Sequence, residues 1–234
     1  MQTIEPTRGA RLFGLAAAVL ILFAFMLQAA PGAPAQGFKD DAPDDKEFPY
    51  KDAGIIDFRT YESPNWGWRV TWEEGWDLDA YYDPPVTTDE ERQYDQLHLA
   101  WSGDDGASAY VTLQGAAATG DDLADELELL TDPAWIAQAW EPHFEVTPFL
   151  TYDDEDSVQV VYSIIDTSDN DARHYTIFET MIVNGDWVYV TFTTNAESLA
   201  AAFDATTGDL RLNRDPILTG IDWHEIEDAI EDAD

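Results

Sequence analysis

The chain of 234 residues contains no cysteine. Without thiols it has no disulfide framework, no thiolate metal site, no cysteine nucleophile and no lipid-modified cysteine anchor. A hydrophobic core therefore has to stabilise the fold, and a chain of this length can bury one of ordinary size.

Basic residues are scarce. The sequence has 11 Lys and Arg side chains against 48 Asp and Glu side chains, a formal net charge of −37. Such a field repels nucleic acid and anionic lipid surfaces, so we expect no nucleic-acid partner. Three interpretations of the charge stay open: solvation in a saline medium, attraction of cations such as calcium, and attraction of a basic protein partner. Acidic residues are scattered through the loops, which favours solvation.

The common catalytic motifs are also missing. There is no Gly-x-Ser-x-Gly, no P-loop and no Gly-x-Gly-x-x-Gly, and His224-Glu-Ile-Glu lacks the second histidine of a zinc-binding helix. We therefore predict no catalytic residue, no metal site and no cofactor. The alternative, an extracytoplasmic hydrolase, requires His98 and His174 to meet an acidic side chain in one cleft.

The longest hydrophobic run, Leu12–Leu27, has 16 residues, fewer than the roughly 20 that span a bilayer comfortably. Arg8 and Arg11 precede it, and Ala33-Pro-Ala35 follows it as a cleavage site, so residues 1–35 are predicted to be a signal peptide of an exported protein. Retention of this segment as a membrane anchor is the alternative. Residues 36–54 are predicted to form an acidic, flexible linker, and residues 55–234 a single domain.

Aromatic residues, in contrast, are abundant, and four of the nine tryptophans lie between Trp66 and Trp76. Apolar residues alternate with polar ones and glycine from Trp66 to Trp72, the pattern of a strand with one buried face, and Glu73-Glu-Gly75 then predicts a turn. We expect Trp68 and Trp72 to lie in the core. Trp66 and Trp76 are predicted to lie at the ends of this packing, where a ligand or partner can reach them.

The second half of the chain is predicted to be rich in strands, at 144–152, 158–166, 173–183 and 187–194. Asn184-Gly185 is a strong hairpin signal, and a two-residue turn there places Glu179 opposite Val190, between neighbours that are apolar. A buried carboxylate needs a partner. Glu179 therefore marks a pocket, with a raised pKa, or has a structural role, either near a sheet end or against an arginine such as Arg69 or Arg59.

Helices are predicted at three places. One begins at an Asp121 cap, and Asp132-Pro133 restarts a second one directly after it. Asn195 caps a core helix, and Asp222 caps an acidic helix at the C-terminus. The pattern as a whole predicts an α+β fold in which an antiparallel sheet is flanked by helices.

Short motifs carry a family resemblance. Tyr61-Glu-Ser-Pro64, Gly67-Trp-Arg-Val70, Glu74-Gly-Trp76 and the strand 189–194 with its following helix resemble the PsbP/Mog1-like group over residues 55–221. The resemblance implies an αβ sandwich in a non-enzymatic, exported or assembly-related protein. The missing lipid-anchor cysteine is a departure from many exported members of that group.

Two acidic loops, 153–156 and 166–171, offer several oxygen ligands for calcium, although neither matches an EF-hand. We expect an exported, non-enzymatic binding or assembly module with an unknown protein or small-molecule partner. Its ligand surface is predicted to include Trp66, Trp76 and Glu179. Membrane contact is expected only if the N-terminal segment is retained. A calcium-binding or salt-adapted acidic domain is a further alternative.

Overall fold

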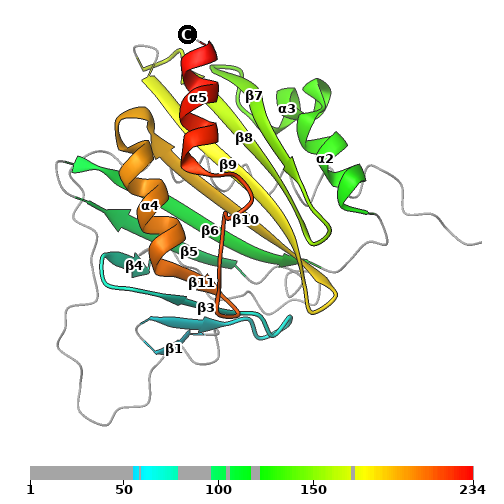
Figure 1. The fold of residues 1–234 in the computed structure, drawn as a ribbon, viewed down its shortest axis with the longest axis vertical. Helices are drawn as coiled ribbons and strands as arrows, with labels where there is room; N and C mark the ends of the chain where they lie inside the picture. The colour runs from blue at the N-terminus through cyan, green and yellow to red at the C-terminus, as the bar shows by residue number, and fades with distance from the viewer. Residues whose placement is uncertain are drawn as a thin grey trace, which may run out of the picture.

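A computed structural model describes residues 55–57, 59–78, 96–103, 106–116, 122–169 and 172–233. The predicted signal peptide (1–35) and linker (36–54) lie outside these ranges. The predicted α+β class is confirmed: the described residues form two antiparallel sheets together with helices (Figure 1). None of the helices in the described ranges is long and apolar enough to cross a membrane.

The larger sheet has seven strands in the order β4-β5-β6-β10-β9-β8-β7, and the smaller one has five in the order β1-β2-β3-β11-β12. The strands of the larger sheet are β4 (Trp76–Leu78), β5 (Gln96–Ser102), β6 (Ser108–Ala116), β10 (Asp186–Asn195), β9 (Ala172–Val183), β8 (Ser157–Asp166) and β7 (Phe144–Asp153). Those of the smaller sheet are β1 (Ile55–Asp57), β2 (Thr60–Glu62), β3 (Arg69–Trp72), β11 (Leu210–Leu212) and β12 (Asp215–Pro216).

The long hairpin β9–β10 has the predicted register. Asn184 and Gly185 both have positive φ, 57° and 89°, as a two-residue hairpin turn of type I′ requires. Glu179 is therefore opposite Val190, as expected from the turn alone.

The tryptophan-rich stretch is split between the two sheets, a division that its sequence pattern does not predict. The predicted strand begins only at Arg69, because Ser63–Gly67 forms a turn in which the Gly67 amide donates to the Ser63 carbonyl. β3 then belongs to the smaller sheet and β4 to the larger one, with Gly75 (φ 105°) in the turn between them. Upstream of this turn, two short strands, β1 and β2, pair with each other.

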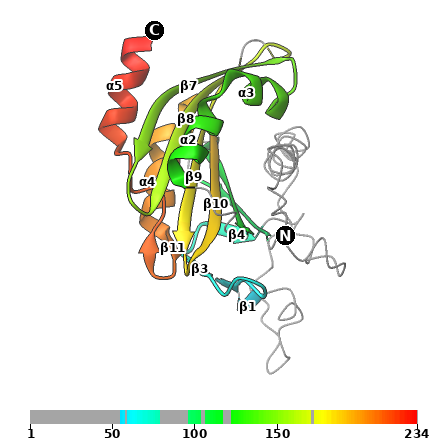
Figure 2. The ribbon, with the colours of Figure 1, turned by 90° about the vertical axis from the view of Figure 1, so that its right-hand side faces the viewer.

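Helices cover both faces of the larger sheet (Figure 2). On one side lie α4 (Leu199–Asp209) and α5 (Trp223–Ala233), and on the other α2 (Leu123–Thr131) and α3 (Pro133–Ala139). The main core, on the α4 side, includes residues of both sheets, and a second core of aromatic residues lies under α2 and α3.

Side-chain caps begin these helices. Asp132 accepts from the Ala134 amide (2.7 Å) at α3, and Asn195 accepts from the Ser198 amide (2.8 Å) in the short 3₁₀ turn before α4. At α2 the cap is Asp122, which accepts from the Asp125 amide, rather than the predicted Asp121. Asp222 and Glu225 form a reciprocal capping box at α5.

Candidate functional site

Three of the four tryptophans between Trp66 and Trp76 are buried. Trp68 and Trp72 are 1% and 3% exposed, so their predicted core positions are confirmed. Trp76 is also only 3% exposed and packs beside Trp101, with ring centroids 6.5 Å apart. Trp66 is half-buried, and a Cβ built on Gly115 of β6 would lie 2.2 Å from its ring. This stretch mainly builds the core. Of the two tryptophans predicted to face a partner only Trp66 keeps exposed surface, so the prediction for Trp76 is wrong.

Glu179 lies in the main core and binds a segment far away in the sequence. One of its carboxylate oxygens accepts from Gln159 Nε2 (2.5 Å), and the other accepts from the Leu218 amide (3.0 Å). Gln159 Oε1 accepts in turn from the Ile221 amide (3.1 Å). The two side chains thus attach the connection between β12 and α5 to the larger sheet, and neither Arg69 nor Arg59 is the partner.

Burial raises the pKa of Glu179 above its ordinary value of 4.5, and the hydrogen bonds from Leu218 and Gln159 oppose that rise. A raised pKa is compatible with a functional carboxylate. The geometry is that of a structural clamp, because both oxygens already accept from protein donors and the side chain is 1% exposed.

The two strand histidines do not meet. His98 lies on β5 and His174 on β9, with β6 and β10 between them. The residue of β9 in line with His98 is Phe178, reached through the pairs His98–Thr112, Thr112–Thr191 and Thr191–Phe178. His174 is four residues from Phe178 along β9. Three strand spacings and four residues separate the two histidines by about 20 Å. His98 Nδ1 lies 3.0 Å from Thr112 Oγ1, and burial lowers the pKa of His174. The cleft that the hydrolase alternative requires is thus not formed by these two residues.

The acidic loops use their oxygens locally. Asp166 accepts from the amide and hydroxyl of Ser168 (2.8 and 2.6 Å). Desolvation alone would raise the pKa of Asp166, but the Ser168 bonds, His143 and the Asp169 backbone together lower it. Asp154 accepts from the Glu155 amide and the Tyr152 hydroxyl. Within the described ranges no group of three acidic or histidine side chains is placed to hold a metal ion. Calcium binding stays a prediction.

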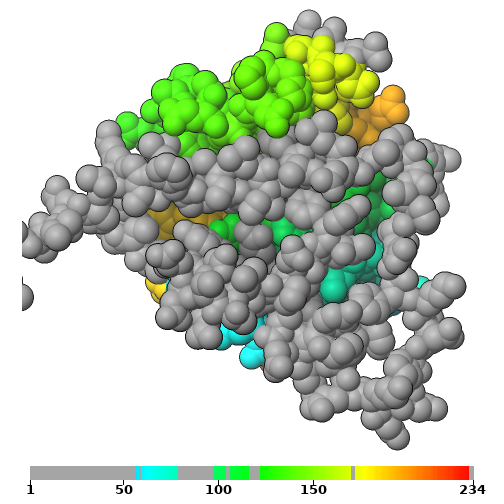
Figure 3. Space-filling model, turned by 180° about the vertical axis from the view of Figure 1, so that it is seen from behind, coloured from blue at the N-terminus to red at the C-terminus, as the bar shows by residue number. Residues whose placement is uncertain are grey.

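A pocket of about 530 Å³ lies between α3 and β7. Its lining is mostly apolar, with eight apolar side chains (Pro133, Ile136, Ala137, Trp140, Pro142, Phe144, Val146, Pro148) and three polar ones (Thr131, Glu141, Thr147). Trp140 and Ile136 are buried at its base, whereas Ala137 and Thr147 are exposed at its rim. Small-molecule sites have volumes and linings of this kind. Figure 3 shows the green atoms of α2 and α3 on the face seen from behind, and Figure 2 shows α4 and α5 on the other side of the sheet.

The base of the pocket is held rigidly. The Trp140 ring packs against Trp135, Tyr162 and Phe178, with centroid distances of 5.5, 5.2 and 6.2 Å. The Tyr162 hydroxyl donates to the Leu130 carbonyl (2.7 Å), and burial raises the pKa of this phenol far above its ordinary value. The pocket therefore stands on a fixed aromatic cluster, and a ligand would not need to order it.

A bulge in β7 gives the pocket its second wall. The pairing of β7 with β8 shifts between Pro148 and Leu150. Before the shift, Phe144 and Val146 face the aromatic core under α3; after it, Leu150 faces the main core on the opposite side. One edge strand thereby supplies apolar residues to both faces of the sheet.

No protein-family model matches this chain, and no curated protein does. The resemblance to the PsbP/Mog1-like group therefore stays a prediction.

This pocket was not predicted from the sequence. Ile136 and Trp140 are four residues apart, a spacing that is typical of ordinary helix packing and does not by itself indicate a pocket. The available signal was the spacing of Pro133, Pro142 and Pro148 around Trp140, since proline has an apolar ring and no backbone N–H donor.

Proposed function

We propose that the protein is an exported, non-enzymatic binding module that takes a small, mainly apolar ligand in the pocket between α3 and β7. The observation that carries the proposal is the pocket itself, about 530 Å³ with eight apolar lining residues and a rigid tryptophan at its base. Export is supported by the N-terminal sequence pattern of residues 1–35.

The charge of the ligand is limited by the charge of the protein. Glu141 is the one ionisable residue in the lining, and the whole chain carries a net charge of −37. An anionic ligand would meet repulsion from both, whereas a neutral one would not. A neutral or singly cationic apolar ligand is therefore the class that fits.

A pair of fluorescent probes tests the proposal. N-phenylnaphthylamine is neutral and apolar, and anilinonaphthalenesulfonate has the same ring system with an added negative charge. We expect the neutral probe to bind with enhanced fluorescence and the anionic one to bind more weakly. Binding of both probes with equal affinity would contradict the charge argument.

A matched pair of variants locates the probe. Ala137→Phe puts a ring at the rim of the pocket, and Gln138→Phe puts the same ring on the next position of α3, which does not line it. We expect the first variant to weaken binding of the neutral probe at least about tenfold, equivalent to about 1.4 kcal/mol, and the second to leave it unchanged. Equal effects of the two substitutions would refute binding at this site.

A further inference from the structure

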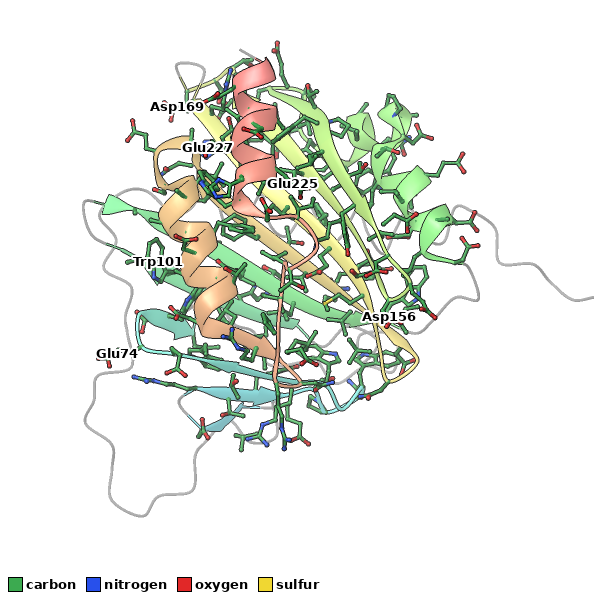
Figure 4. All side chains as sticks on the ribbon, in the orientation of Figure 1. Glu74, Trp101, Asp156, Asp169, Glu225 and Glu227 are labelled. Atoms are coloured by element: carbon green, nitrogen blue, oxygen red, sulfur yellow. The ribbon has the colours of Figure 1, made fainter. Side chains whose placement is uncertain are left out.

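The smaller sheet holds most of the positive charge in the described part of the chain. Of the five described Lys and Arg residues, Arg59, Arg69, Arg211 and Arg214 belong to the strands and turns of this sheet, and Arg173 belongs to the larger one. Figure 4 shows nitrogen-tipped side chains at the lower edge of the molecule, below β3 and β11. In a chain with a net charge of −37, such clustering is unexpected from composition alone.

Two of these arginines line one pocket. A hollow of about 390 Å³ is formed by Arg69, Thr71, Asn213 and Arg214, and both arginines are exposed. The floor is fixed by a reciprocal pair of bonds: the Arg69 amide donates to Asn213 Oδ1 (2.9 Å), and the Asn213 amide donates to the Arg69 carbonyl (2.7 Å). The two backbones that carry the guanidinium groups are thereby held next to each other.

Neither guanidinium forms an ion pair with another residue in the described part of the chain. Among the described residues, the ion pairs within 4.0 Å do not include Arg69 or Arg214. Glu62 is opposite Arg69 in the β2–β3 pairing and Asp215 follows Arg214, but neither forms such a pair. Arg211, in contrast, donates to the carbonyls of Thr207 and Leu210 at the end of α4, so it is already engaged.

The turn that carries Arg214 is conformationally costly. The hairpins β9–β10 and β11–β12 have the same two-residue turn, with φ values of 57° and 89° at Asn184-Gly185 and 50° and 87° at Asn213-Arg214. The second position of this turn favours glycine, since a side chain at positive φ is strained. The β11–β12 turn has an arginine there instead. A strained residue that persists is often part of a functional site.

We infer that the pocket formed by Arg69, Thr71, Asn213 and Arg214 binds a doubly charged oxyanion such as phosphate or sulfate. Two unpaired guanidinium groups supply two positive charges and planar donors that match oxyanion geometry. The Thr71 hydroxyl and the Asn213 side chain add neutral polar groups to the same hollow. This site is separate from the apolar pocket and does not rest on the function proposed for it.

Inorganic phosphate is the probe that tests the site. The apparent Kd is measured from the rise in Tm with phosphate concentration. Sodium chloride is varied to keep the ionic strength at 0.1 M, where the Debye length is about 10 Å. Arg69→Gln and Arg214→Gly remove the two pocket arginines. Arg59→Gln makes the same change of charge on the same sheet, outside the pocket.

We expect the wild type and Arg59→Gln to bind phosphate alike, and both pocket variants to bind roughly tenfold or more weakly, because each loses charge-assisted hydrogen bonds. Without phosphate, Arg214→Gly is expected to have a higher Tm than the wild type, since glycine relieves the strain at φ 87°. A variant that binds phosphate more weakly and yet has a higher Tm without phosphate has lost the site and not the fold.

Two results would overturn the inference. If phosphate raises the Tm of all four proteins equally, the effect is the general exclusion of kosmotropic anions from protein surfaces. If acetate at the same ionic strength gives the same rise as phosphate, the site does not select a doubly charged anion.

Discussion

At the scale of single residues, Glu179 shows how the same buried carboxylate can be a clamp and a titrating group. Its two oxygens accept from Gln159 and from the Leu218 amide, so the side chain attaches the β12–α5 connection. Its surroundings disfavour the ionised form, because desolvation is the largest influence on its pKa. Glu179 therefore holds the connection in place and makes stability depend on pH.

Replacement of Glu179 by glutamine is expected to remove one component of that pH dependence. Between the ordinary pKa of 4.5 and the raised pKa of the folded state, the folded protein keeps a proton that the unfolded chain has released. The contribution to stability is thus full below pH 4.5 and is lost as the pH rises through the folded pKa. Relative to Glu179→Gln, the wild type should lose free energy of unfolding over this interval.

Urea unfolding at a series of pH values measures the difference between the two proteins. Glu145→Gln serves as the control, because it makes the same chemical change at an exposed position of β7. A constant difference between the wild type and Glu179→Gln from pH 4 to neutral pH would show that Glu179 has no raised pKa.

At the scale of elements, Gly115 of β6 packs closely against Trp66 and Trp68, which lie in and just after the turn Ser63–Gly67 that leads into β3 of the smaller sheet. A Cβ at Gly115 would lie 2.2 Å from Trp66 and 2.7 Å from the buried indole nitrogen of Trp68. Both rings are large, and Trp68 is almost fully buried. The glycine is therefore required by sterics rather than by backbone conformation.

Two glycine-to-alanine substitutions are expected to have opposite effects. Gly115→Ala should destabilise the protein by about 1–3 kcal/mol, because the inserted methyl group overpacks a well-filled core. Gly208→Ala should stabilise it by up to about 1 kcal/mol, since the position is helical and no atom lies within 4 Å of the added Cβ. Chemical denaturation measures both. Equal destabilisation by the two variants would contradict the close approach at Gly115.

The elements also show which parts of the fold can be predicted from the sequence. The register of β9–β10 follows from local chemistry, because Asn184-Gly185 specifies a two-residue turn. The separation of β3 from β4 does not, since β3 pairs with β11, more than 130 residues later in the chain. The α3–β7 pocket was missed for a related reason: strict alternation along β7 cannot reveal the bulge that redirects its side chains.

At the scale of the whole molecule, the negative charge is distributed rather than gathered. Figure 4 shows Glu74, Asp156 and Asp169 at separate edges, and Glu225 and Glu227 on α5. Scattered carboxylates repel one another across the folded state, and those in the described ranges do not form a chelating group. This distribution supports the salt-adapted alternative, in which the charge serves solvation.

Salt is therefore expected to stabilise the protein in a manner that does not depend on cation identity. The Tm should rise with potassium chloride, mostly between 0.01 and 1 M, where the Debye length falls from about 30 to about 3 Å and repulsion among the 48 acidic residues is screened. At constant potassium chloride, millimolar calcium and magnesium chloride should produce equal further shifts, since both act only as divalent counterions.

The comparison of calcium with magnesium is what distinguishes solvation from specific binding. A loop that offers several flexible oxygens prefers calcium, because magnesium demands a compact octahedron and gives up its water reluctantly. A site of that kind, bound only in the folded state, would make the calcium shift larger than the magnesium shift. A larger calcium shift that disappears in Asp166→Asn would assign a calcium site to the β8–β9 loop and would contradict a purely solvating role of the charge.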